Sequence, residues 1–509
     1  MGLADETYVD CRGGAVRDSR DAWIAAGLFS VALLIRVLVL ALCPFDGLYG
    51  QDAYAYYDYA VTLRASLMHG QPFPPFFWPL GYPLHVVAAM GVLGVTPLAG
   101  QMVSLIAGAL IAPLTFALTR EALLPIDARR ARRAGVAAGL IVAAAGQLMI
   151  SSVSIMSDAT GLAWATASAW LTLHYASRRT LRPVPLMLAA FALSMAVIAR
   201  WVYGLLAFPW AACVGWAWRR NWSTIGWRRA TTLTLSAIVV GGVIVGAQLL
   251  AGEAHTGDLQ VVGWHPANIL RRQVVNSDGA FEYALPTGLF YARPLIDPSF
   301  AFPLLTPLLV IGARTLVRSG RSASVLLIGW LLVVYVFLAG IAWQNERFSL
   351  AFFPPLAVWV GLGTDAIWQA RRTSWLVGLL TVSLTGMGVW GLRDVSGFVN
   401  RKNADVDRAR HAASQLPDDA RVITFGLTLT LKHYTDLDAI EIYGETPDSL
   451  RDRVCGHGTV FAYLDVVNIE RQWQGLSPEI NYHALRDGPG LTMIDLYAGF
   501  TLLKIGDCE

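Results

Sequence analysis

The chain has 509 residues, of which 55% are hydrophobic and 15% are charged, and its mean hydropathy is +0.49. Average soluble domains carry about 25% charged residues, so this chain has too few charges to cover a globular surface of its size. The composition argues against a soluble enzyme, a disordered protein and a nucleic-acid binder, and it predicts a polytopic α-helical membrane protein.

Charge is distributed unevenly along the chain. The stretch from Arg393 to Glu509 has 12 basic and 18 acidic residues, whereas 27 basic and 18 acidic residues precede it. A basic hydrophobic part followed by an acidic part indicates two domains. We therefore expect a cytoplasmic leader at 1–21, a transmembrane domain at 22–392 and an extracytoplasmic α/β domain at 393–509.

The first apolar run, Trp23–Cys43, follows a leader with three arginines and is too long for a signal-peptide core. It predicts a signal-anchor helix with its amino end in the cytoplasm. Further apolar runs of sufficient length lie at 99–119, 134–151, 158–177, 184–199, 201–218, 230–251, 300–317, 323–342, 348–368 and 374–392.

Basic clusters between these runs set the expected topology. By the positive-inside rule they should all be cytoplasmic, which holds if the short stretch 82–96 is a half-inserted helix. This gives 11 full spans, or 13 if that stretch and one other also cross, with the carboxyl terminus outside. The clusters are Arg129–Arg133, Arg178–Arg182, Arg219–Arg229, Arg314–Arg321 and Arg371–Arg372.

Two loops and the tail then lie on the outer side. The loops at 44–81 and 252–299 are rich in Trp, Tyr, Pro and Gly, which is typical of folded backbone at a membrane interface. Within the first loop, the helical spacing of Asp52–Leu67 predicts an amphipathic helix lying on the membrane.

In the tail, short apolar runs alternate with polar segments of helical pattern at 448–453 and 466–473, which predicts a small α/β layer. The sequence there has no glycine-rich phosphate loop. The expected strands are 420–425, 439–443, 459–465, 491–497 and 500–505.

Two aspartates at predicted outer helix ends are candidates for base catalysis. Asp52 follows the first span within GLYGQDAYAYYDYA, and Asp158 opens the span at 158–177. A carboxylate just above the hydrocarbon, among aromatic side chains, is well placed to accept a proton. Each aspartate could instead cap the helix that follows it, because aspartate is a favoured N-cap residue. The local sequence leaves both interpretations open.

Arginines at predicted outer positions form a second set. A cation inside a membrane helix costs about 2.5–3.5 kcal/mol, so such residues usually face a partner or a polar cavity. Ordinary snorkelling to the headgroups is the alternative, but the pattern favours an anionic ligand such as a lipid phosphate. These residues are Arg200, Arg347 and the loop pair Arg271 and Arg272, which lie beside Trp264 and His265; Arg36 lies within the first span.

Together these motifs resemble the glycosyltransferase C superfamily, especially the bacterial relatives of protein O-mannosyltransferases and lipid A aminoarabinose transferases. The resemblance covers most of 22–392. It rests on the intramembrane Arg36, on QDAYAYYDYA, on PLGYP at 79–83, on SDATG at 157–161, on the Arg200 turn and on ERFSLAFFPPLA at 346–357.

The resemblance implies an inverting enzyme of the cell membrane that moves a sugar from a polyprenyl-phosphate donor to a glycan, lipid or protein acceptor at the outer face. Asp52 matches the family's general base, Asp158 its later acidic position and Arg347 the arginine of its R-[YF] motif. Many members have two adjacent acidic residues where this chain has Gln51–Asp52. The resemblance therefore leaves open whether a single carboxylate or a pair acts in catalysis. Candidates for the donor phosphate are Arg347, Arg200, Arg271 and Arg272, and candidates for substrate contacts are Tyr54, Tyr82, His85, Trp264 and His265.

Other interpretations remain at this point. A transporter or flippase also has many spans and intramembrane arginines, and an oligosaccharide ligase uses a related donor. The sequence has no Cys/His cluster typical of zinc, and a divalent-cation requirement stays open. In an oxidising compartment Cys455 and Cys508 could form a disulfide or remain free thiols.

Overall fold

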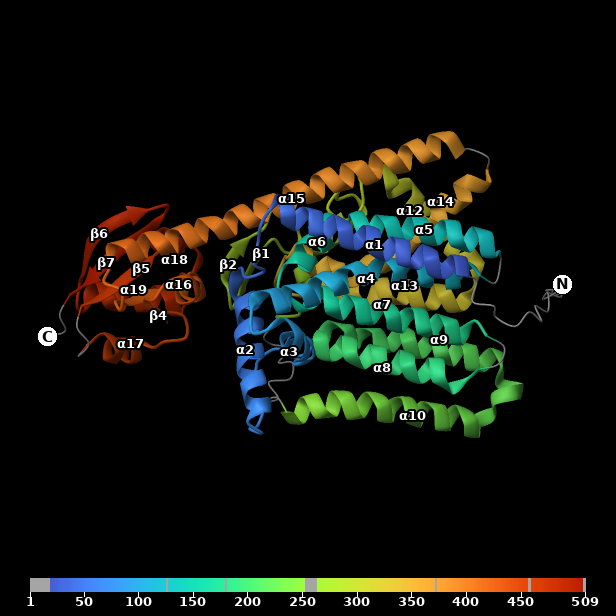
Figure 1. The fold of residues 1–509 in the computed structure, drawn as a ribbon, viewed down its shortest axis with the longest axis horizontal. Helices are drawn as coiled ribbons and strands as arrows, with labels where there is room; N and C mark the ends of the chain where they lie inside the picture. The colour runs from blue at the N-terminus through green and yellow to red at the C-terminus, as the bar shows by residue number, and fades with distance from the viewer. Residues whose placement is uncertain are drawn as a thin grey trace.

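The computed structural model describes residues 19–124, 127–178, 181–251, 263–370, 373–455 and 459–506. Long helices run side by side along the longest axis, and a sheet domain lies at one end of them (Figure 1). The helices along this axis are α1 (Ser19–Leu42), α4 (Pro97–Leu123), α5 (Ala128–Ala144), α7 (Ser157–Ala176), α8 (Pro183–Ala199), α9 (Ala207–Arg220), α10 (Trp222–Ala251), α12 (Thr306–Ser319), α13 (Arg321–Gly340), α14 (Phe353–Gln369) and α15 (Thr373–Gln415). The short helix α6 (Gly146–Val153) follows α5 at an angle.

Among the described residues, six helices are long and apolar enough to cross a membrane, and the bent pair α5–α6 makes a seventh if it is counted as one span. The prediction of a multi-pass helical membrane protein is confirmed. The predicted spans at 158–177, 184–199, 201–218 and 300–317 are also helical, in part as the 3-10 turns η1 (Trp201–Leu206) and η4 (Pro303–Leu305). The number of 11 crossings stays a prediction.

The span expected at 134–151 is not one straight helix, because the chain bends by 58° between α5 and α6. The backbone of Ala145 is extended there. Gly146 packs directly on α15, where an added Cβ would lie 2.7 Å from the Cα of Gly391. The amide of Gln147 donates to the carbonyl of Ser299 at 3.0 Å. These contacts turn α6 away from the axis of α5, which the hydrophobicity of the segment could not reveal.

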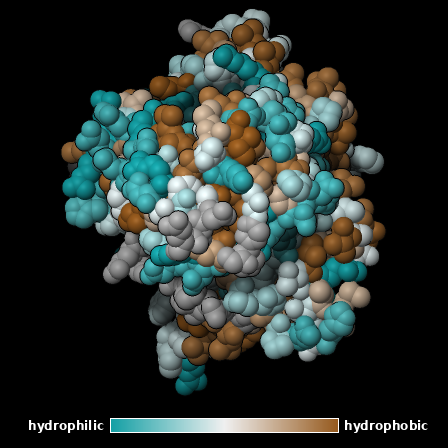
Figure 2. Space-filling view, turned by 90° about the vertical axis from the view of Figure 1, so that its left-hand side faces the viewer, coloured by the Kyte–Doolittle hydropathy of each residue, from teal (hydrophilic) through white to brown (hydrophobic). Residues whose placement is uncertain are grey.

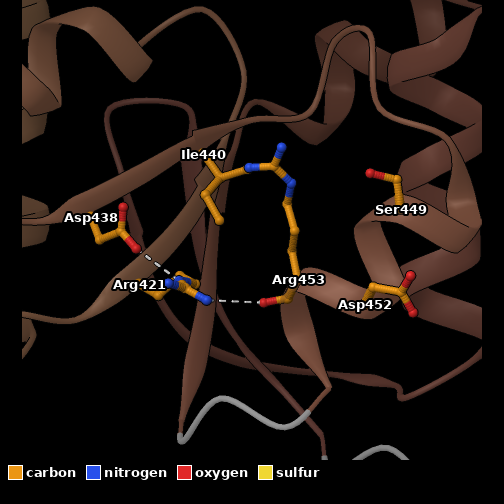
Figure 3. A pocket seen from close by; sticks show the side chains of 6 residues that line it. All are labelled: Arg421, Asp438, Ile440, Ser449, Asp452 and Arg453. Carbon is orange, nitrogen blue, oxygen red and sulfur yellow. Dashed lines mark hydrogen bonds and ion pairs between the residues drawn. The ribbon is translucent and has the colours of Figure 1, made fainter.

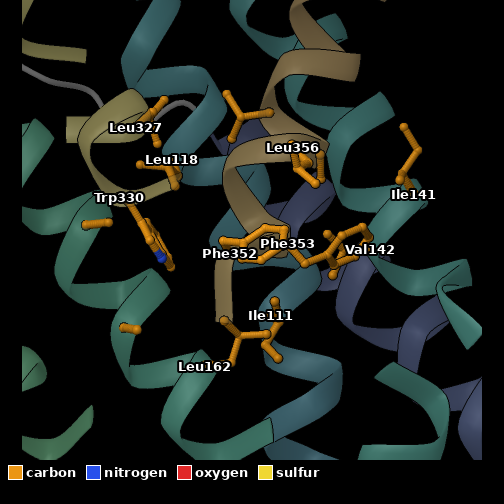
Figure 4. Close-up of a cluster of buried hydrophobic side chains, with 14 of the residues drawn as sticks. Ile111, Leu118, Ile141, Val142, Leu162, Leu327, Trp330, Phe352, Phe353 and Leu356 are labelled. Atoms are coloured by element: carbon orange, nitrogen blue, oxygen red, sulfur yellow. The ribbon is translucent and has the colours of Figure 1, made fainter. Parts of the chain in front are cut away.

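The interior of the bundle is a packed apolar core (Figure 4), in which Trp330 and Phe353 are almost fully buried. The indole nitrogen of Trp330 donates to the carbonyl of Ala351 at 2.7 Å, so even its polar atom has a partner. α12 and α14 approach so closely that a Cβ on Gly363 would lie 2.1 Å from the carbonyl oxygen of Leu308. Small residues allow such close packing of membrane helices.

Helix α2 (Gly50–Met68) runs across the end of the bundle nearest the sheet domain (Figure 1). The expected helix at Asp52–Leu67 is thus confirmed. α3 (Gly81–Leu93) packs on α2 and has 13 residues, fewer than the roughly 20 that cross a bilayer. It agrees with the short helix expected at 82–96, but it ends earlier at Gly94, whose φ is +78°.

The second outer loop contains structure that the sequence did not reveal. Its described part holds η2 (Pro266–Leu270), an antiparallel hairpin of β1 (Gln273–Asn276) and β2 (Gly279–Glu282), α11 (Thr287–Ala292) and η3 (Arg293–Leu295). The hairpin touches the sheet domain, where Gln472 donates to the carbonyl of Asp278 at 2.7 Å and Tyr443 donates to the carbonyl of Ser277 at 3.2 Å.

The sheet domain has five strands in the order β4-β3-β5-β7-β6, with β3 parallel to β4 and β5, and β7 antiparallel to β5 and β6. Each expected strand is confirmed within about two residues, as are α17 and α18, whereas α16 and α19 were not predicted. The elements are β3 (Arg421–Thr424), α16 (Thr428–Tyr434), β4 (Asp438–Glu441), α17 (Pro447–Val454), β5 (Val460–Leu464), α18 (Val466–Gln472), α19 (Ser477–Asp487), β6 (Leu491–Tyr497) and β7 (Phe500–Ile505).

The outer surface of this end is mixed, with hydrophilic residues beside hydrophobic ones (Figure 2). By contrast, the apolar helix α10, long enough to cross a membrane, exposes Val239, Val243 and Leu250. This difference in surface fits an aqueous environment for the sheet domain and a lipid environment for the bundle.

The boundary expected at 393 falls inside α15, which continues without a break to Gln415. This helix carries the chain from the bundle into the sheet domain (Figure 1). Lys402 on α15 forms an ion pair with Asp46 at 3.0 Å, and the hydroxyl of Tyr434 on α16 also donates to Asp46. Cys455 is disulfide-bonded; Cys508, the candidate partner named above, lies outside the described residues.

Candidate active site

Asp52 lies in the first turn of α2 and forms an ion pair with Arg347, whose Nη2 is 2.5 Å from Oδ2 of the carboxylate. Arg347 belongs to the 3-10 helix η5 (Glu346–Phe352), and Asn345 caps this helix by accepting the amide of Arg347 at 3.2 Å. Both charged side chains are about one-fifth exposed. The residue at the N-cap of α2 is Tyr49, so Asp52 does not cap its helix.

Asp158 forms the second ion pair, with Nη1 of Arg200 2.5 Å from its Oδ1. Asp158 is in the first turn of α7, whose N-cap residue is Met156, so capping is again not its role. Arg200 follows the last residue of α8 with an extended backbone. α3 begins against this point, since a Cβ on Gly81 would lie 2.6 Å from the carbonyl oxygen of Ile198.

The ring of Phe348 joins the two pairs. The guanidinium of Arg200 lies 5.2 Å from the ring centroid and that of Arg347 lies 5.3 Å from it. Cation–π contacts within about 6 Å are attractive. Nη1 of Arg347 also approaches Sδ of Met156 at 3.2 Å, two residues before Asp158. Two aspartates and two arginines, 295 and 42 residues apart within their pairs, therefore form one site at the end of the bundle.

Hydrogen bonds of two tyrosines and two serines connect the helices next to this site. The hydroxyls of Tyr56 and Ser157 are 3.0 Å apart, which connects α2 to α7. Burial raises the pKa of Tyr56, and the charge of Asp52 raises it further. The buried Tyr82 donates to the carbonyl of Gly100 at 3.1 Å and shares a 2.8 Å hydrogen bond with Ser104. The first of these bonds holds α2 against the start of α7, and the others hold α3 against α4.

Two polar atoms of the site are buried and have no hydrogen-bond partner among the described residues: Nε of Arg347 and Oδ2 of Asp158. A buried donor or acceptor without a partner costs about 1–3 kcal/mol, so native proteins retain few of them. Here one donor and one carboxylate acceptor remain in the same site, which is the pattern expected where a ligand supplies the missing bonds.

The other predicted residues of the first loop lie at the edges of this site. His85 on α3 is half-buried; its Nε2 accepts from the indole of Trp164 at 3.2 Å, and its Nδ1 is 2.6 Å from the carbonyl of Gly81. Tyr54 faces the sheet domain instead, with its ring against His433 at 5.8 Å. Burial raises the pKa of Tyr54 to about 12.

The predicted residues of the second loop are exposed. Trp264 packs where a Cβ on Gly340 would clash with its indole at 2.3 Å, and the amide of His265 donates to the carbonyl of Gly340 at 2.8 Å. Arg272 donates to the carbonyl of Tyr283 at 3.0 Å, and the hydroxyl of Tyr283 accepts the amide of Gln344 at 3.3 Å. The loop thus contacts the segment before Arg347, but within the described chain Arg271 and Arg272 make no ion pair with either aspartate.

Arg36 is fully buried in the bundle, where it donates to the hydroxyl of Ser152 at 3.0 Å and to the carbonyl of Ala32 at 2.8 Å. Sequence analysis assigned no role in the site to Phe348, Tyr56, Ser157 and Met156, although the first three lie within the motifs quoted there. The R-[YF] motif at 347–348 was a signal for Phe348, because an aromatic residue beside a membrane arginine often receives its charge.

A separate cavity of about 420 Å³ opens in the sheet domain, lined by two arginines, two aspartates, a serine and an isoleucine (Figure 3). Arg421 pairs with Asp438 at 2.7 Å and donates to the carbonyl of Arg453 at 3.3 Å. These residues begin β3 and β4, whereas the hairpin β1–β2 contacts loops that follow the strands. The cavity therefore lies at the amino-terminal ends of β3 and β4, whereas the contacts with the bundle's hairpin lie beyond the carboxyl ends of the strands. It is not part of the aspartate site.

Within the described residues, no group of three or more His, Cys, Asp and Glu side chains has the geometry to hold a metal ion. In the aspartate site each carboxylate is already bound by a guanidinium, and the positive charge of two arginines repels a cation. In this arrangement the two carboxylates do not by themselves form a metal site.

No protein-family model matches the sequence, and no curated protein matches it in sequence. In fold, the chain is similar to ArnT from Cupriavidus metallidurans bound to undecaprenyl phosphate, with 13% identity, 95% of this chain and 98% of that chain covered, and a TM-score of 0.62. It is also similar to the archaeal oligosaccharyltransferase AglB from Archaeoglobus fulgidus in complex with an inhibitory peptide and a dolichol-phosphate, with 12% identity, 95% and 74% covered, and a TM-score of 0.55.

A further structure of the Archaeoglobus fulgidus oligosaccharyltransferase, in complex with Zn and sulfate, has 14% identity and a TM-score of 0.53 over 94% of this chain and 73% of that chain. The expected fold, a helical membrane bundle followed by an α/β domain, is thus confirmed, and it is similar to the folds of ArnT and the oligosaccharyltransferase. At this level of identity the likeness concerns the fold, and the chemistry must be argued from the site.

Proposed function

We propose that this protein is an inverting membrane glycosyltransferase that moves a sugar from a polyprenyl-phosphate donor to an acceptor of the cell envelope. The observation that carries the proposal is the pair of Asp–Arg contacts around Phe348. They combine a base with two cations at the end of a bundle whose fold is shared with proteins bound to undecaprenyl phosphate and dolichol-phosphate.

Asp52 acts as the general base. It accepts the proton of the acceptor hydroxyl while that oxygen forms a bond to the anomeric carbon of the sugar. The bond between that carbon and the phosphate oxygen breaks, and its electron pair leaves with the phosphate. Attack opposite to the leaving group inverts the configuration. Asp158, more deeply buried than Asp52, holds Arg200 in place through their 2.5 Å contact.

Arg347 and Arg200 stabilise the departing phosphate. The leaving group is already an anion, so it needs positive charge rather than a proton, unlike the leaving alcohol in glycoside hydrolysis. Phe348 keeps the two guanidiniums next to each other. Fixed charges in a site with little water stabilise developing charge strongly, because they need no rearrangement during the reaction.

The helices around the site accommodate the rest of the two substrates. α3, with Tyr82 and His85, and the apolar ends of the neighbouring spans receive the prenyl chain. The sheet domain and the second outer loop, with Trp264, His265, Arg271 and Arg272, face the acceptor, and Tyr54 anchors the sheet domain on α2. These assignments extend the roles expected from the sequence.

In the cell membrane, the amino terminus is cytoplasmic and the sheet domain is extracytoplasmic. The arginine-bearing ends of α9 and α12, and Arg178 just after α7, lie at the end of the bundle opposite to the sheet domain (Figure 1), and such clusters stay in the cytoplasm. The site then opens to the outer face, where lipid-linked sugars are consumed.

Purified full-length protein, incubated with radiolabelled polyprenyl-phosphate monosaccharides and a membrane extract, tests the proposal. We expect label to move from the donor lipid to a product of different mobility. Transfer only from pyrophosphate-linked oligosaccharides would identify a ligase. Movement of lipid-linked sugar across proteoliposomes, without any transfer, would identify a transporter and contradict the proposal.

A further inference from the structure

The arginines that would receive the donor's phosphate are bound to the protein's own carboxylates. Arg347 contacts Asp52 at 2.5 Å and Arg200 contacts Asp158 at 2.5 Å. A carboxylate and a phosphate both present oxygen acceptors of the same charge sign to a guanidinium. Asp52 therefore occupies a position on Arg347 that a phosphate oxygen would also favour.

The same contact hinders Asp52 as a base. A carboxylate held by a guanidinium at hydrogen-bond distance has its charge neutralised and one oxygen engaged. An acceptor hydroxyl would then have to compete with Arg347 for Oδ2 of the carboxylate. The two functions required of the site, phosphate binding and proton removal, are mutually blocked as long as the Asp52–Arg347 pair is formed.

The two pairs differ in how easily they can open. The carboxylate of Asp158 is 4% exposed and that of Asp52 is 23% exposed. Asp52 lies near the end of α2, where the preceding Gly50 has a φ of +69° and would have open space around an added Cβ. On the other side, Nε of Arg347 has no hydrogen-bond partner among the described residues and can take up a further acceptor.

We propose that the donor's phosphate displaces Asp52 from Arg347, so that the base is released only when the donor is bound. This inference rests on the proposed function and adds an order to it. Phosphate oxygens take over Nη2 and engage the free Nε of Arg347, while Phe348 keeps the guanidinium in place. Asp52, now unpaired and next to the anomeric carbon, accepts the proton of the acceptor.

The exchange gives the enzyme a safeguard. A base released only beside a bound donor cannot activate water or an acceptor in the donor's absence. The cost appears in donor affinity, because the donor binds only the fraction of molecules in which Arg347 is open. If that fraction is about one-tenth, the apparent dissociation constant is raised about tenfold.

Binding of undecaprenyl phosphate to the full-length protein in lipid nanodiscs tests the exchange without requiring transfer. Asp52→Asn keeps the shape of the side chain and removes the competing charge. We expect this variant to bind undecaprenyl phosphate about tenfold more tightly than the wild type. Asp52→Ala, which also removes the competitor, gives the same reading if the asparagine variant does not fold.

Two controls separate the exchange from a general effect of charge. Asp58→Asn removes the same charge from the same helix at an exposed position and should change the affinity less than twofold. In an Arg347→Gln background the effect of Asp52→Asn should disappear, because there is no guanidinium left to compete for. The double-mutant cycle isolates this coupling.

The outcomes are distinct. Unchanged or weaker binding by Asp52→Asn, or a gain that persists with Arg347→Gln or equals that of Asp58→Asn, would overturn the exchange alone. Absence of undecaprenyl phosphate binding by the wild type would overturn the exchange and the proposed donor together. Transfer by the wild type from labelled donor decides the proposed function independently of these affinities.

Discussion

Buried carboxylates at the two ends of the bundle differ in how many of their oxygens have hydrogen-bond partners. At the end away from the sheet domain, Asp365 on α14 is 1% exposed and accepts from Arg130 at 3.0 Å, from Arg133 at 2.9 Å and from Gln369 at 2.6 Å. At the end near the sheet domain, Asp158 is 4% exposed and its Oδ2 has no hydrogen-bond partner among the described residues.

The difference separates structural charge from reactive charge. Asp365 connects α5 to α14 with both oxygens in use, so nothing further can bind to it. Asp52 and Asp158 each form an ion pair with one arginine. Both of these arginines contact the ring of Phe348. Satisfied polar networks stabilise one conformation, whereas unsatisfied ones in native proteins require a functional reason.

Among the variants considered, Arg347→Gln at the aspartate site should lower the rate of transfer most. It removes the charge that faces the departing phosphate, so we expect transfer to fall about 10²–10³-fold. The midpoint of thermal unfolding in detergent should change little, because Asp52 is partly exposed and can be solvated. An activity loss that merely follows a loss of folded protein would contradict the assignment.

Asp365→Asn, at the other end of the bundle, should lower the stability and leave the activity nearly unchanged. Removing one partner of a buried ion pair usually costs about 3–5 kcal/mol, and the partial exposure of Arg130 and Arg133 reduces this to about 2 kcal/mol. We expect a lower unfolding midpoint, with transfer per folded molecule within twofold of the wild type. A selective loss of activity with normal stability would assign Asp365 to the chemistry.

Phe348→Leu tests whether the ring that contacts both arginines contributes to transfer. Leucine keeps the apolar volume and removes the cation–π contacts, each of which contributes about 0.5–2 kcal/mol. We expect about tenfold slower transfer, measured as kcat, with a smaller change in stability. Phe348→Tyr should retain most of the activity, and equal losses in both variants would indicate a packing role alone.

The smallest effect is expected in the sheet domain, at Glu441. Burial raises the pKa of Glu441, although the hydroxyl of Thr428, which donates to it at 2.8 Å, lowers it. Because the folded pKa lies above the unfolded one, stability should fall as the pH rises from about 4 through the raised pKa. Glu441→Gln should remove this fall, so the stability of the variant relative to the wild type should be higher at pH 7 than at pH 4. A constant difference in unfolding midpoint would contradict this origin.

Local pattern was sufficient for much of this fold. Alternating apolar runs predicted the five strands of the sheet domain, and helical spacing predicted α2, because each pattern is contained within a few residues. The bend at Ala145 and the continuation of α15 to Gln415 depend on contacts between distant segments, such as Gly146 on Gly391. No local pattern contains that information.

The site was predictable by residue type and not by pairing. Asp52 and Asp158 were singled out as carboxylates at outer helix ends, and Arg200 and Arg347 because a cation in a membrane helix is costly. Their pairing across 295 residues, and the role of Phe348 between them, required the fold. Arg271 and Arg272 were singled out with these arginines but lie in an exposed loop, where charge needs no special reason.

The central claim is that Asp52 removes a proton from the acceptor. Steady-state transfer from labelled polyprenyl-phosphate sugar by Asp52→Asn, with Asp58→Asn as a matched control on the same helix, tests it most directly. We predict a loss of about 10²–10⁴-fold for Asp52→Asn, with donor still bound, and activity within twofold for Asp58→Asn. Undiminished transfer by Asp52→Asn would contradict the account.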